Sequence, residues 1–418
     1  MQRALRSIEA IRATDEQIRA WVTVGDEEAL RQAEWVNAAV KSGTALPLAG
    51  MTVGVKDVFD VAGLPTIAGF LPFSRRPTAS RDAAVVARLR AAGAIILGKT
   101  VTTQFAAGDP AMTRNPWNLA RTPGGSSSGS AAAVAARHVD AALGTQTGGS
   151  VLRPAAFCGV LGFKPTFGWA STQGLIPLAP ALDHVGLFAH SVTDLARLYD
   201  VLADDGLPRA GACAALGAPR IGVWADPLSR ASAVMRDAVI DAVERLARAG
   251  ATVLDATCPL SFQNLLAVHH TLMWSDMAGV HRTLIARYPD DYSPKLRMSI
   301  EVGAATPVSA YVAAGAVRDQ VVGQLRQRWS DYDVIVFPTA DGGAPAPETT
   351  GNTELQAVIT LLGLPAISIP IGFDPDGLPL AMQLIGSRRG ADVELLRVAR
   401  WVETLMPKLT VPPIIASD

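Results

Sequence analysis

Two clusters of glycine and serine, joined by a short alanine-rich segment, constrain this chain more than any other stretch of it. They occupy residues 124–130 (GGSSSGS) and 148–150 (GGS), and the alanine-rich segment is residues 131–138. Glycine lets backbone N–H groups converge where a Cβ would interfere, and serine supplies a hydroxyl. A chain with both residue types on either side of one short helix can place a nucleophile beside N–H groups that stabilise an anion. The pattern therefore predicts nucleophilic chemistry at these clusters.

Units of helix, glycine and strand recur along the chain. Residues 82–97 (DAAVVARLRAAGAIIL) are predicted to form a helix, a stop at Gly93 and a buried strand, and residues 234–254 repeat this order around Gly250. Such units are typical of an α/β protein in which helices cover the faces of a sheet. No shift in composition divides the strand signals into two sets, so we predict a single domain over residues 1–418. Additional strands are expected at 51–56, 333–337, 365–371 and 382–385, and mostly helix over 260–330.

The N-terminal residues 1–42 are expected to form a helical arm that packs on or near this core. Ile11, Ile18 and Trp21 keep helical spacing, and the pattern continues as a second amphipathic helix. Such helices usually pack on a core, and a dimer contact is the alternative. The Gly-, Ala- and Pro-rich residues 205–219 are the best candidate for a linker.

Composition argues against several classes of partner. Hydrophobic residues make up 49% of the chain, and a net charge of -1 gives no electrostatic reason to expect nucleic acid or an anionic membrane. No apolar run approaches the roughly 18 residues of a membrane span, and the N-terminus lacks the apolar region of a signal peptide. The three cysteines and six histidines show no spacing typical of a disulfide framework or a metal site. We therefore expect a cytoplasmic protein that uses no metal and no cofactor.

Two motif matches fail their structural tests. Residues 93–100 (GAIILGKT) fit the P-loop pattern, but a helix precedes them and the residues between the glycines are strand-like, whereas a phosphate-binding loop follows a strand. Residues 125–129 (GSSSG) fit a nucleophile elbow with Ser127 as the nucleophile, but no buried strand leads into them. A further alternative is that both clusters are only turns and helix caps, with Ser128 or Ser130 as an N-cap.

A wider set of motifs resembles the amidase signature family. These markers span nearly the whole chain, which makes them far more specific than a single short pattern. The resemblance implies an amidase signature fold, an α/β fold with a large mixed central β-sheet covered by helices on both faces. The matching segments are GVKDVFD at 54–60, GGSSSGSAAAVAA at 124–136, ALGTQTGGS at 142–150, RPAAFCGVLGFKPTFG at 153–168, LDHVGLFAHSVTDLA at 182–196 and GLPAISIPIG at 363–372.

The resemblance also implies a role for each residue of a catalytic triad. Ser150 is the nucleophile that forms an acyl-enzyme, Ser126 is a bridging serine held on a cis peptide bond, and Lys56 is the base. Burial lowers the pKa of a lysine, so a neutral Lys56 could take a proton from Ser126 while Ser126 takes one from Ser150. The implied oxyanion hole consists of the backbone N–H groups of Thr147, Gly148, Gly149 and Ser150.

Two residues depart from the commoner pattern of the family. Gln146 stands where many members have aspartate, and Arg153 follows the nucleophile by three positions, where many members place an arginine two positions after it. Both features resemble a malonamidase-like subgroup, in which the matching arginine holds a substrate carboxylate. The resemblance therefore implies that Arg153 and Gln146 bind substrate, and a structural ion pair is the alternative for Arg153.

The expected function is that of an amidohydrolase acting on a small molecule: an amide, a malonamate-like amide or a carbamate. Carbamate- or aryl-amide-specific hydrolases of the same family are one alternative. Another is the A-type subunit of a tRNA-dependent amidotransferase, which would act with partner proteins. A catalytically silent binding protein is disfavoured because Lys56, Ser126 and Ser150 are all present. The family suggests a homodimer, and pocket walls are expected from residues near 169–180, 290–312 and 338–352.

Overall fold

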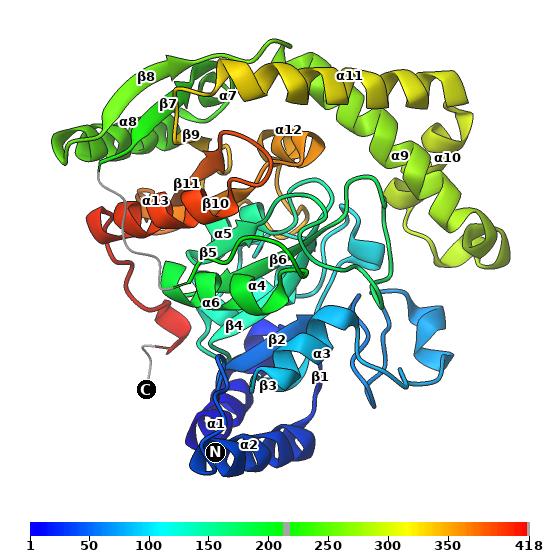
Figure 1. The fold of residues 1–418 in the computed structure, drawn as a ribbon. Coiled ribbons are helices and arrows are strands. Elements are labelled where there is room, and N and C mark those ends of the chain that lie inside the picture. The colour runs from blue at the N-terminus through cyan, green and yellow to red at the C-terminus, as the bar shows by residue number, and fades with distance from the viewer. Residues whose placement is uncertain (212–217, 416–418) are drawn as a thin grey trace.

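A mixed sheet forms the centre of the computed structural model, which describes residues 1–211 and 218–415. Its eleven strands lie in the order β1-β3-β2-β4-β6-β5-β10-β11-β9-β7-β8, with helices on both faces (Figure 1). The expected α/β fold is confirmed. Part of the predicted linker, residues 212–217, lies outside the described residues. The strands are β1 (Trp21–Val24), β2 (Thr52–Lys56), β3 (Ile95–Thr100), β4 (Ala141–Gln146), β5 (Leu161–Lys164), β6 (His184–Ala189), β7 (Arg220–Trp224), β8 (Thr252–Ala256), β9 (Val334–Pro338), β10 (Ala366–Phe373) and β11 (Pro379–Gly386).

Alternating side chains of the strands pack into separate cores on the two faces of the sheet. Val334 and Val336 of β9 belong to one core, whereas Ile335 and Phe337 belong to another, as the two-residue period of a strand requires. The first core includes helices α3 (Ala84–Ala91), α6 (Val192–Leu202), α8 (Ala233–Arg248) and α13 (Asp392–Leu405). The cores of the opposite face include α1 (Gln2–Ile18), α2 (Asp26–Lys41), α4 (Ser128–Ala135), α5 (Leu152–Cys158), α9 (Phe262–Arg287), α11 (Val308–Arg328) and α12 (Glu354–Leu362).

Both predicted units of helix, glycine and strand are present. Helix α3 leads through Gly93 into β3, and α8 leads through Gly250 into β8. Both glycines have positive φ angles, 89° and 106°, a conformation that reverses the chain at the end of a helix and favours glycine. β3 lies parallel to β2, and β8 lies parallel to β7.

The N-terminal arm differs from the prediction at Trp21. Helix α1 ends at Ile18 because Arg19 adopts a left-handed conformation with φ 58°, and the Asp15 carboxylate then accepts a hydrogen bond from the backbone N–H of Ala20. Trp21 therefore starts strand β1, which pairs antiparallel with the edge of β3. The helical spacing continued by chance past the end of the helix.

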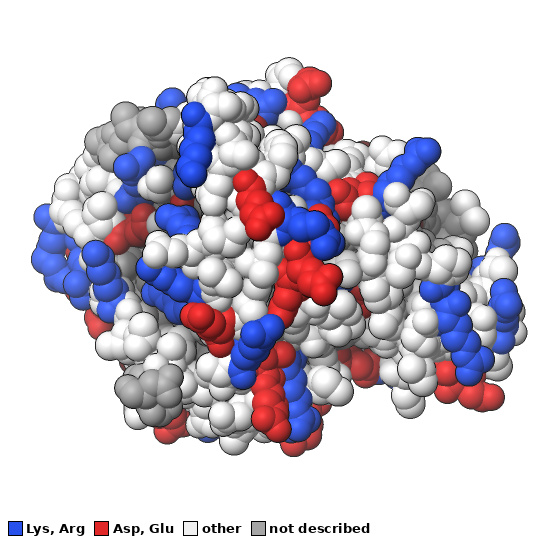
Figure 2. Space-filling model, turned by 90° about the horizontal axis from the view of Figure 1, so that it is seen from below, with Lys and Arg blue, Asp and Glu red and all other residues white. Residues whose placement is uncertain are grey.

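The segment expected to be mostly helical consists of α9, α10 (Pro294–Ala305) and α11, which project together from the sheet (Figure 1). Within the described ranges, no single helix is long and apolar enough to cross a membrane, although α10 and α11, bent by 97°, pass such a test as a pair by length and composition. Figure 2 shows acidic and basic side chains intermingled over one face of the molecule, in keeping with the small net charge.

Candidate active site

The residues of the expected triad come from neighbouring strand ends and from the turns before two helices. β2 and β4 are adjacent and parallel, so Lys56 at the end of β2 lies beside Thr145 near the end of β4. Ser126 and Ser150 precede α4 and α5, respectively. Because the carboxyl ends of parallel strands share one edge of the sheet, chemistry concentrates at this place.

Lys56 is completely buried and forms a hydrogen bond with the candidate bridging serine. Its Nζ lies 2.8 Å from Ser126 Oγ and 2.7 Å from Thr145 Oγ1. Burial lowers the pKa of Lys56 well below its ordinary value of 10.5, and the Asp183 carboxylate opposes this shift. A lysine amine with a lowered pKa loses its proton more readily and can act as a base.

The turn that carries Ser126 is held against α5. The Gly125–Ser126 peptide bond is cis, and Arg153 Nη2 donates a hydrogen bond to the Gly125 carbonyl oxygen at 2.6 Å. Gly124 has φ 80°, and a Cβ there would lie 2.8 Å from Pro154 Cα. The close approach of the two backbones therefore requires glycine at this position.

Residues 147–150 form a loop that side chains hold from several directions. Thr147 Oγ1 donates to Asp183 at 2.5 Å, and His269 Nε2 donates to the Thr147 carbonyl at 2.9 Å. The Thr360 hydroxyl donates to the Gly148 carbonyl at 2.6 Å. With its carbonyl groups engaged in this way, the loop is fixed before any ligand binds, which is the condition for preorganised N–H donors.

Ser150 opens onto a cavity of about 370 Å³ that the whole loop lines. Ser150 is 7% exposed, and its hydroxyl has no hydrogen bond with any described residue. Lys56 and Ser126 are therefore already joined, whereas a hydrogen bond from Ser126 to Ser150 is not formed in this structure. Thr147, Gly148 and Gly149, the remaining candidates for the oxyanion hole, line the same cavity.

Gln146 lies behind the loop and does not line this cavity. Its Oε1 accepts the backbone N–H groups of Val151 and Leu152 at 2.9 and 3.0 Å, and its Nε2 donates to Thr360 Oγ1 at 2.9 Å. The side chain thus satisfies N–H groups at the start of α5 that have no partner within the helix. The structure gives Gln146 a positioning role and offers no support for the substrate contact expected from the sequence.

Arg153 lines the cavity and carries a buried charge without an ionic partner. Nη2 bonds to the Gly125 carbonyl and to Thr350 Oγ1, whereas Nε and Nη1 have no hydrogen-bond partner. No carboxylate of the described residues lies within ion-pair distance of this guanidinium, and Asp341 acts on it only through longer-range attraction. The structural ion pair considered from the sequence is therefore absent from this part of the chain.

Much of the remaining wall of the cavity comes from helices that sequence motifs did not mark. Leu178, Lys295 and Thr350 fall in the segments expected to form walls, but helix α9 supplies a side that was missed. The α9 residues that line the cavity are His269, His270, Met273, Trp274 and Met277. The sequence predicts helix over this segment, but it does not show which face of α9 contacts residues 147–150.

The rejected motifs have structural roles. Lys99 of the P-loop lookalike is buried in β3 and pairs with Asp57 at 2.7 Å. Ser127 of the elbow lookalike is buried beneath the turn, where its Oγ contacts the backbone N–H and carbonyl of Thr145. Ser127, and not Ser128 or Ser130, is the N-cap of α4, and it makes no capping hydrogen bond. Over residues 1–211 and 218–415, no group of three His, Cys, Asp or Glu side chains is placed to hold a metal ion.

Comparison with known proteins identifies the family. The Amidase family profile matches residues 4–396. The chain belongs to this family. Amidase enzymes act on carbon–nitrogen bonds, so the expected class of enzyme is confirmed at that level.

The relatives of this amidase include amidotransferase subunits and a peptide amidase. The A-type subunit of the glutamyl-tRNA(Gln) amidotransferase from Synechococcus sp. (strain JA-2-3B'a(2-13)) is 34% identical over 451 residues, covering 94% of this chain and 86% of the relative. The crystal structure of the corresponding Thermotoga maritima protein has 28% identity and a TM-score of 0.80 over 98% of this chain and 94% of that one. A Stenotrophomonas maltophilia peptide amidase has 28% identity and a TM-score of 0.86 over 99% and 95%.

These relatives bear on the finer expectations drawn from the sequence. They do not support placing this amidase in the malonamidase-like subgroup, because curated relatives that match nearly the whole chain are named amidotransferase subunits.

Proposed function

We propose that this amidase cleaves a small carboxamide through an acyl-enzyme on Ser150. The observation that carries the proposal is the 2.8 Å contact between buried Lys56 and Ser126. A base that is kept dry and joined to a hydroxyl can move a proton without a histidine.

The first half of the reaction forms a tetrahedral intermediate on Ser150. Neutral Lys56 takes the proton of Ser126 as Ser126 takes that of Ser150, and Ser150 Oγ forms a bond to the carbonyl carbon of the substrate. The carbonyl oxygen becomes an oxyanion beside the N–H groups of Gly149 and Ser150. Donors of this kind are each worth about 2.7–4 kcal/mol of transition-state stabilisation.

The second half of the reaction forms and hydrolyses the acyl-enzyme, and it returns Lys56, Ser126 and Ser150 to their starting protonation states. Protonated Lys56 passes its proton back through Ser126 to the amide nitrogen, the C–N bond breaks, and ammonia or an amine leaves. Water then attacks the acyl-enzyme and gives its proton to Lys56 by way of Ser126. As the bond to Ser150 Oγ breaks, Lys56 returns that proton through Ser126 to Ser150, which frees the enzyme and releases a carboxylic acid. The cycle requires the Ser150 hydroxyl to turn toward Ser126 when substrate is bound.

The charges around the cavity support a substrate that carries a carboxylate. Arg153 is a buried cation with two unpartnered nitrogens, and the Lys295 side chain lines the mouth of the same cavity. A buried unpaired charge is costly, and a carboxylate is the natural partner of a guanidinium. Malonamate-like amides and amide amino acids such as glutamine both meet this description.

The comparisons favour a second, narrower proposal, that the chain is the amide-cleaving subunit of an amidotransferase. The relatives named as A-type amidotransferase subunits match nearly the whole chain at 34% identity. The net charge of -1 gives this chain no electrostatic basis for holding tRNA by itself. Under this proposal the chain releases ammonia from an amide donor, and partner subunits hold the acceptor.

One experiment tests the residue assignments. Wild type, Ser150→Ala and Ser127→Ala are incubated with an activated ester, and the intact masses are measured. We expect an acyl adduct on wild type and on Ser127→Ala, mapped to Ser150, and none on Ser150→Ala. A label on Ser127, or turnover that survives Ser150→Ala, would overturn the assignment.

A second experiment separates the stand-alone hydrolase from the amidotransferase component. Ammonia release from glutamine, malonamate, a carbamate and a simple amide is measured for the chain alone and for the chain purified from its own cells with its bound partners. Glutamine hydrolysis that depends on stoichiometric partners supports the amidotransferase proposal. Full turnover of malonamate by the isolated chain refutes it.

A further inference from the structure

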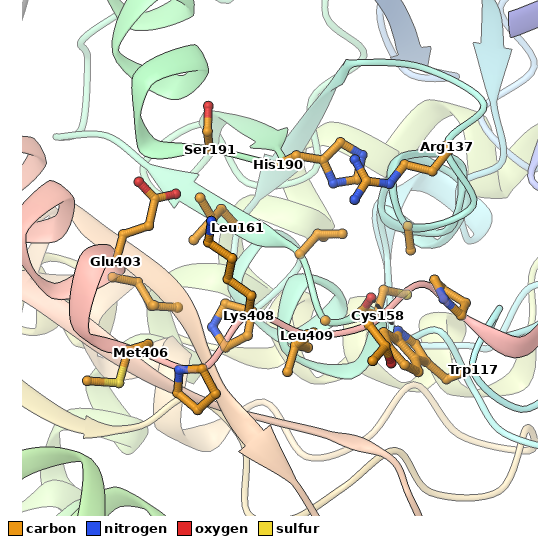
Figure 3. Close-up of a pocket in the computed structure, with 18 of the residues that line it drawn as sticks. Trp117, Arg137, Cys158, Leu161, His190, Ser191, Glu403, Met406, Lys408 and Leu409 are labelled. Carbon is orange, nitrogen blue, oxygen red and sulfur yellow. Dashed lines mark hydrogen bonds between the residues drawn. The ribbon is translucent and has the colours of Figure 1, made fainter. Parts of the chain in front are cut away.

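A second cavity lies at the far end of helix α5 from the candidate nucleophile. It has a volume of about 660 Å³, and the turn that follows α5, residues 158–161, forms part of its wall (Figure 3). Ser150 and its cavity lie at the opposite end of the helix. None of the residues of this second cavity takes part in the chemistry described above.

Much of the second cavity is apolar. Leu161 at the start of β5 and Val160 just before it line the cavity. Ile369 lines it from β10, and Met406 and Leu409 line it from the segment after α13. All but Leu409 belong to the buried core of the molecule. Apolar surface around a hollow of this size suits an organic ligand with a hydrocarbon body.

Positively charged side chains outnumber negatively charged ones around this apolar region. Figure 3 shows Arg137 and His190 together on one side, Lys408 reaching toward the middle and Glu403 on the other side. Neither Arg137 nor Lys408 forms an ion pair within the described residues, whereas Glu403 accepts a hydrogen bond from the Val192 N–H at 3.0 Å. Two cations therefore face one carboxylate that is already engaged.

His190 adds a polar atom but no charge to the balance. Burial, with repulsion from Arg137, lowers the pKa of His190 to about 4, so its ring is neutral near pH 7. Its Nε2 is buried without a hydrogen-bond partner among the described residues. The cavity thus keeps an excess of positive charge and one unsatisfied polar atom.

The backbone of Arg137 gives an independent reason to look for a role of its side chain. Its φ of 59° lies in the left-handed region just after α4, where glycine is the residue without strain and others cost roughly 1 kcal/mol. The fold of this turn does not need arginine. The guanidinium it supplies lines the cavity instead.

We propose that this second cavity binds a small organic carboxylate with an apolar body. The carboxylate lies between Arg137 and Lys408, which donate charge-assisted hydrogen bonds, and the hydrocarbon part lies against Leu161, Ile369 and Met406. This site is separate from the cavity of Ser150, and the proposal does not depend on the function proposed for the Ser150 cavity.

Phenylacetate is a suitable probe, with 2-phenylethanol as its uncharged analogue. Binding to the full-length protein is measured by ligand-detected NMR titration. We expect saturable binding of phenylacetate that weakens about tenfold or more in Arg137→Gly and in Lys408→Met, since each removes a charged donor. Glu403→Gln should tighten binding, because it removes the opposing charge and keeps the acceptor for Val192.

Two controls keep the test decisive. Arg137→Gly relieves the left-handed backbone, so its unfolding midpoint should equal or exceed that of wild type, and lost binding cannot be ascribed to unfolding. Lys295→Met removes a cation from the cavity of Ser150 and should leave phenylacetate binding unchanged. The proposal fails if Lys295→Met weakens binding while Arg137→Gly does not, if 2-phenylethanol binds equally well, or if no saturable binding occurs.

Discussion

Lys56 shows how far the environment of one residue decides the chemistry of a site. The same side chain at a solvated strand end would be a permanent cation, because its ordinary pKa is near 10.5. Here the removal of water favours the neutral amine, and two hydroxyls, those of Ser126 and Thr145, are its partners. Asp183 lies near enough to pull the pKa partly back up.

This arrangement predicts the pH dependence of amide hydrolysis. Activity should rise with pH as Lys56 loses its proton, with the ascending limb of kcat/KM well below the ordinary lysine range. Asp183→Asn removes the carboxylate that raises the Lys56 pKa, so the limb should move to lower pH even if the maximal rate also falls. Measuring kcat/KM from about pH 4 to pH 10 for both proteins checks the rise with pH and the direction of the shift. An ascending limb that moves to higher pH in Asp183→Asn contradicts the assignment.

Lys99 and Asp57 form a second buried pair whose role is structural. Lys99 is also bonded to the Pro65 carbonyl and to Thr66, and Asp57 accepts the N–H groups of Ile67 and Ala68. The pair therefore ties β3 to the loop after β2, directly beside Lys56.

Replacing one member of this pair should lower the free energy of unfolding much more than removing both charges does. Lys99→Met leaves a buried unpaired carboxylate and should lower the free energy of unfolding by about 3–5 kcal/mol. The double variant Asp57→Asn with Lys99→Met should recover a large part of that loss, as measured by urea denaturation. If the double variant shows the sum of the two single losses, the two residues act independently.

At the scale of elements, helix α12 sets the position of the loop that holds Ser150. Thr360 bonds to the Gly148 carbonyl, and Gln356, held by the Thr339 carbonyl, lies against Gly149. A Cβ on Gly149 would overlap Gln356 Oε1, whereas a Cβ on Gly148 would meet only His269 at 3.9 Å. Two neighbouring glycines of the loop thus differ in the space around them.

The difference predicts opposite tolerance to alanine. Gly149→Ala should displace the loop and reduce kcat by roughly 100-fold, the scale of one lost oxyanion donor, whereas Gly148→Ala should retain most of the activity. Adding Gln356→Ala to Gly149→Ala removes the overlapping atom and should restore part of kcat. Steady-state kinetics with one fixed amide decide the matter, and a Gly148→Ala enzyme as impaired as Gly149→Ala would refute the steric argument.

The N-terminal arm is joined to the core by a histidine that must stay neutral. Trp21 Nε1 donates to His138 Nδ1 at 3.1 Å, so Nε2 carries the proton and donates to Thr14 Oγ1 at 2.7 Å. Burial lowers the pKa of His138 to about 4. Protonation of Nδ1 would remove the acceptor for Trp21.

Acid should therefore loosen α1 and β1 before the rest of the sheet. Because the unfolded histidine titrates near 6.5 and the folded one near 4, its contribution to stability is complete above pH 6.5 and is lost as pH falls toward 4. Hydrogen exchange, corrected for intrinsic rates, should show this loss of protection in α1 and β1. In His138→Gln the same elements should lose less protection between pH 6.5 and pH 4; an equal loss would exclude His138 as the cause.

At the scale of the whole molecule, the sequence alone predicted those features that a few neighbouring residues determine. The units ending at Gly93 and Gly250, and the serine clusters around α4, were readable because a turn or a short motif fixes them. β1 was not readable, since four residues become a strand only by pairing with β3. The α9 wall was missed for the same reason, because it depends on contacts between segments far apart in the chain, such as His269 with Thr147. Gln146 makes one such contact, with Thr360, and otherwise binds the nearby N–H groups of Val151 and Leu152.

The distribution of lysine has a practical consequence for following the state of the molecule. The chain has six lysines, and three of them, Lys56, Lys99 and Lys164, are completely buried. An amine-reactive reagent should therefore modify the N-terminus and the remaining three, Lys41, Lys295 and Lys408, while the fold is intact. Each further adduct in a mass spectrum then reports that a buried lysine has become accessible, so the number of adducts measures unfolding. Two of the three accessible lysines also line the two cavities discussed above, so protection of either one by a ligand would report occupancy in the same spectrum.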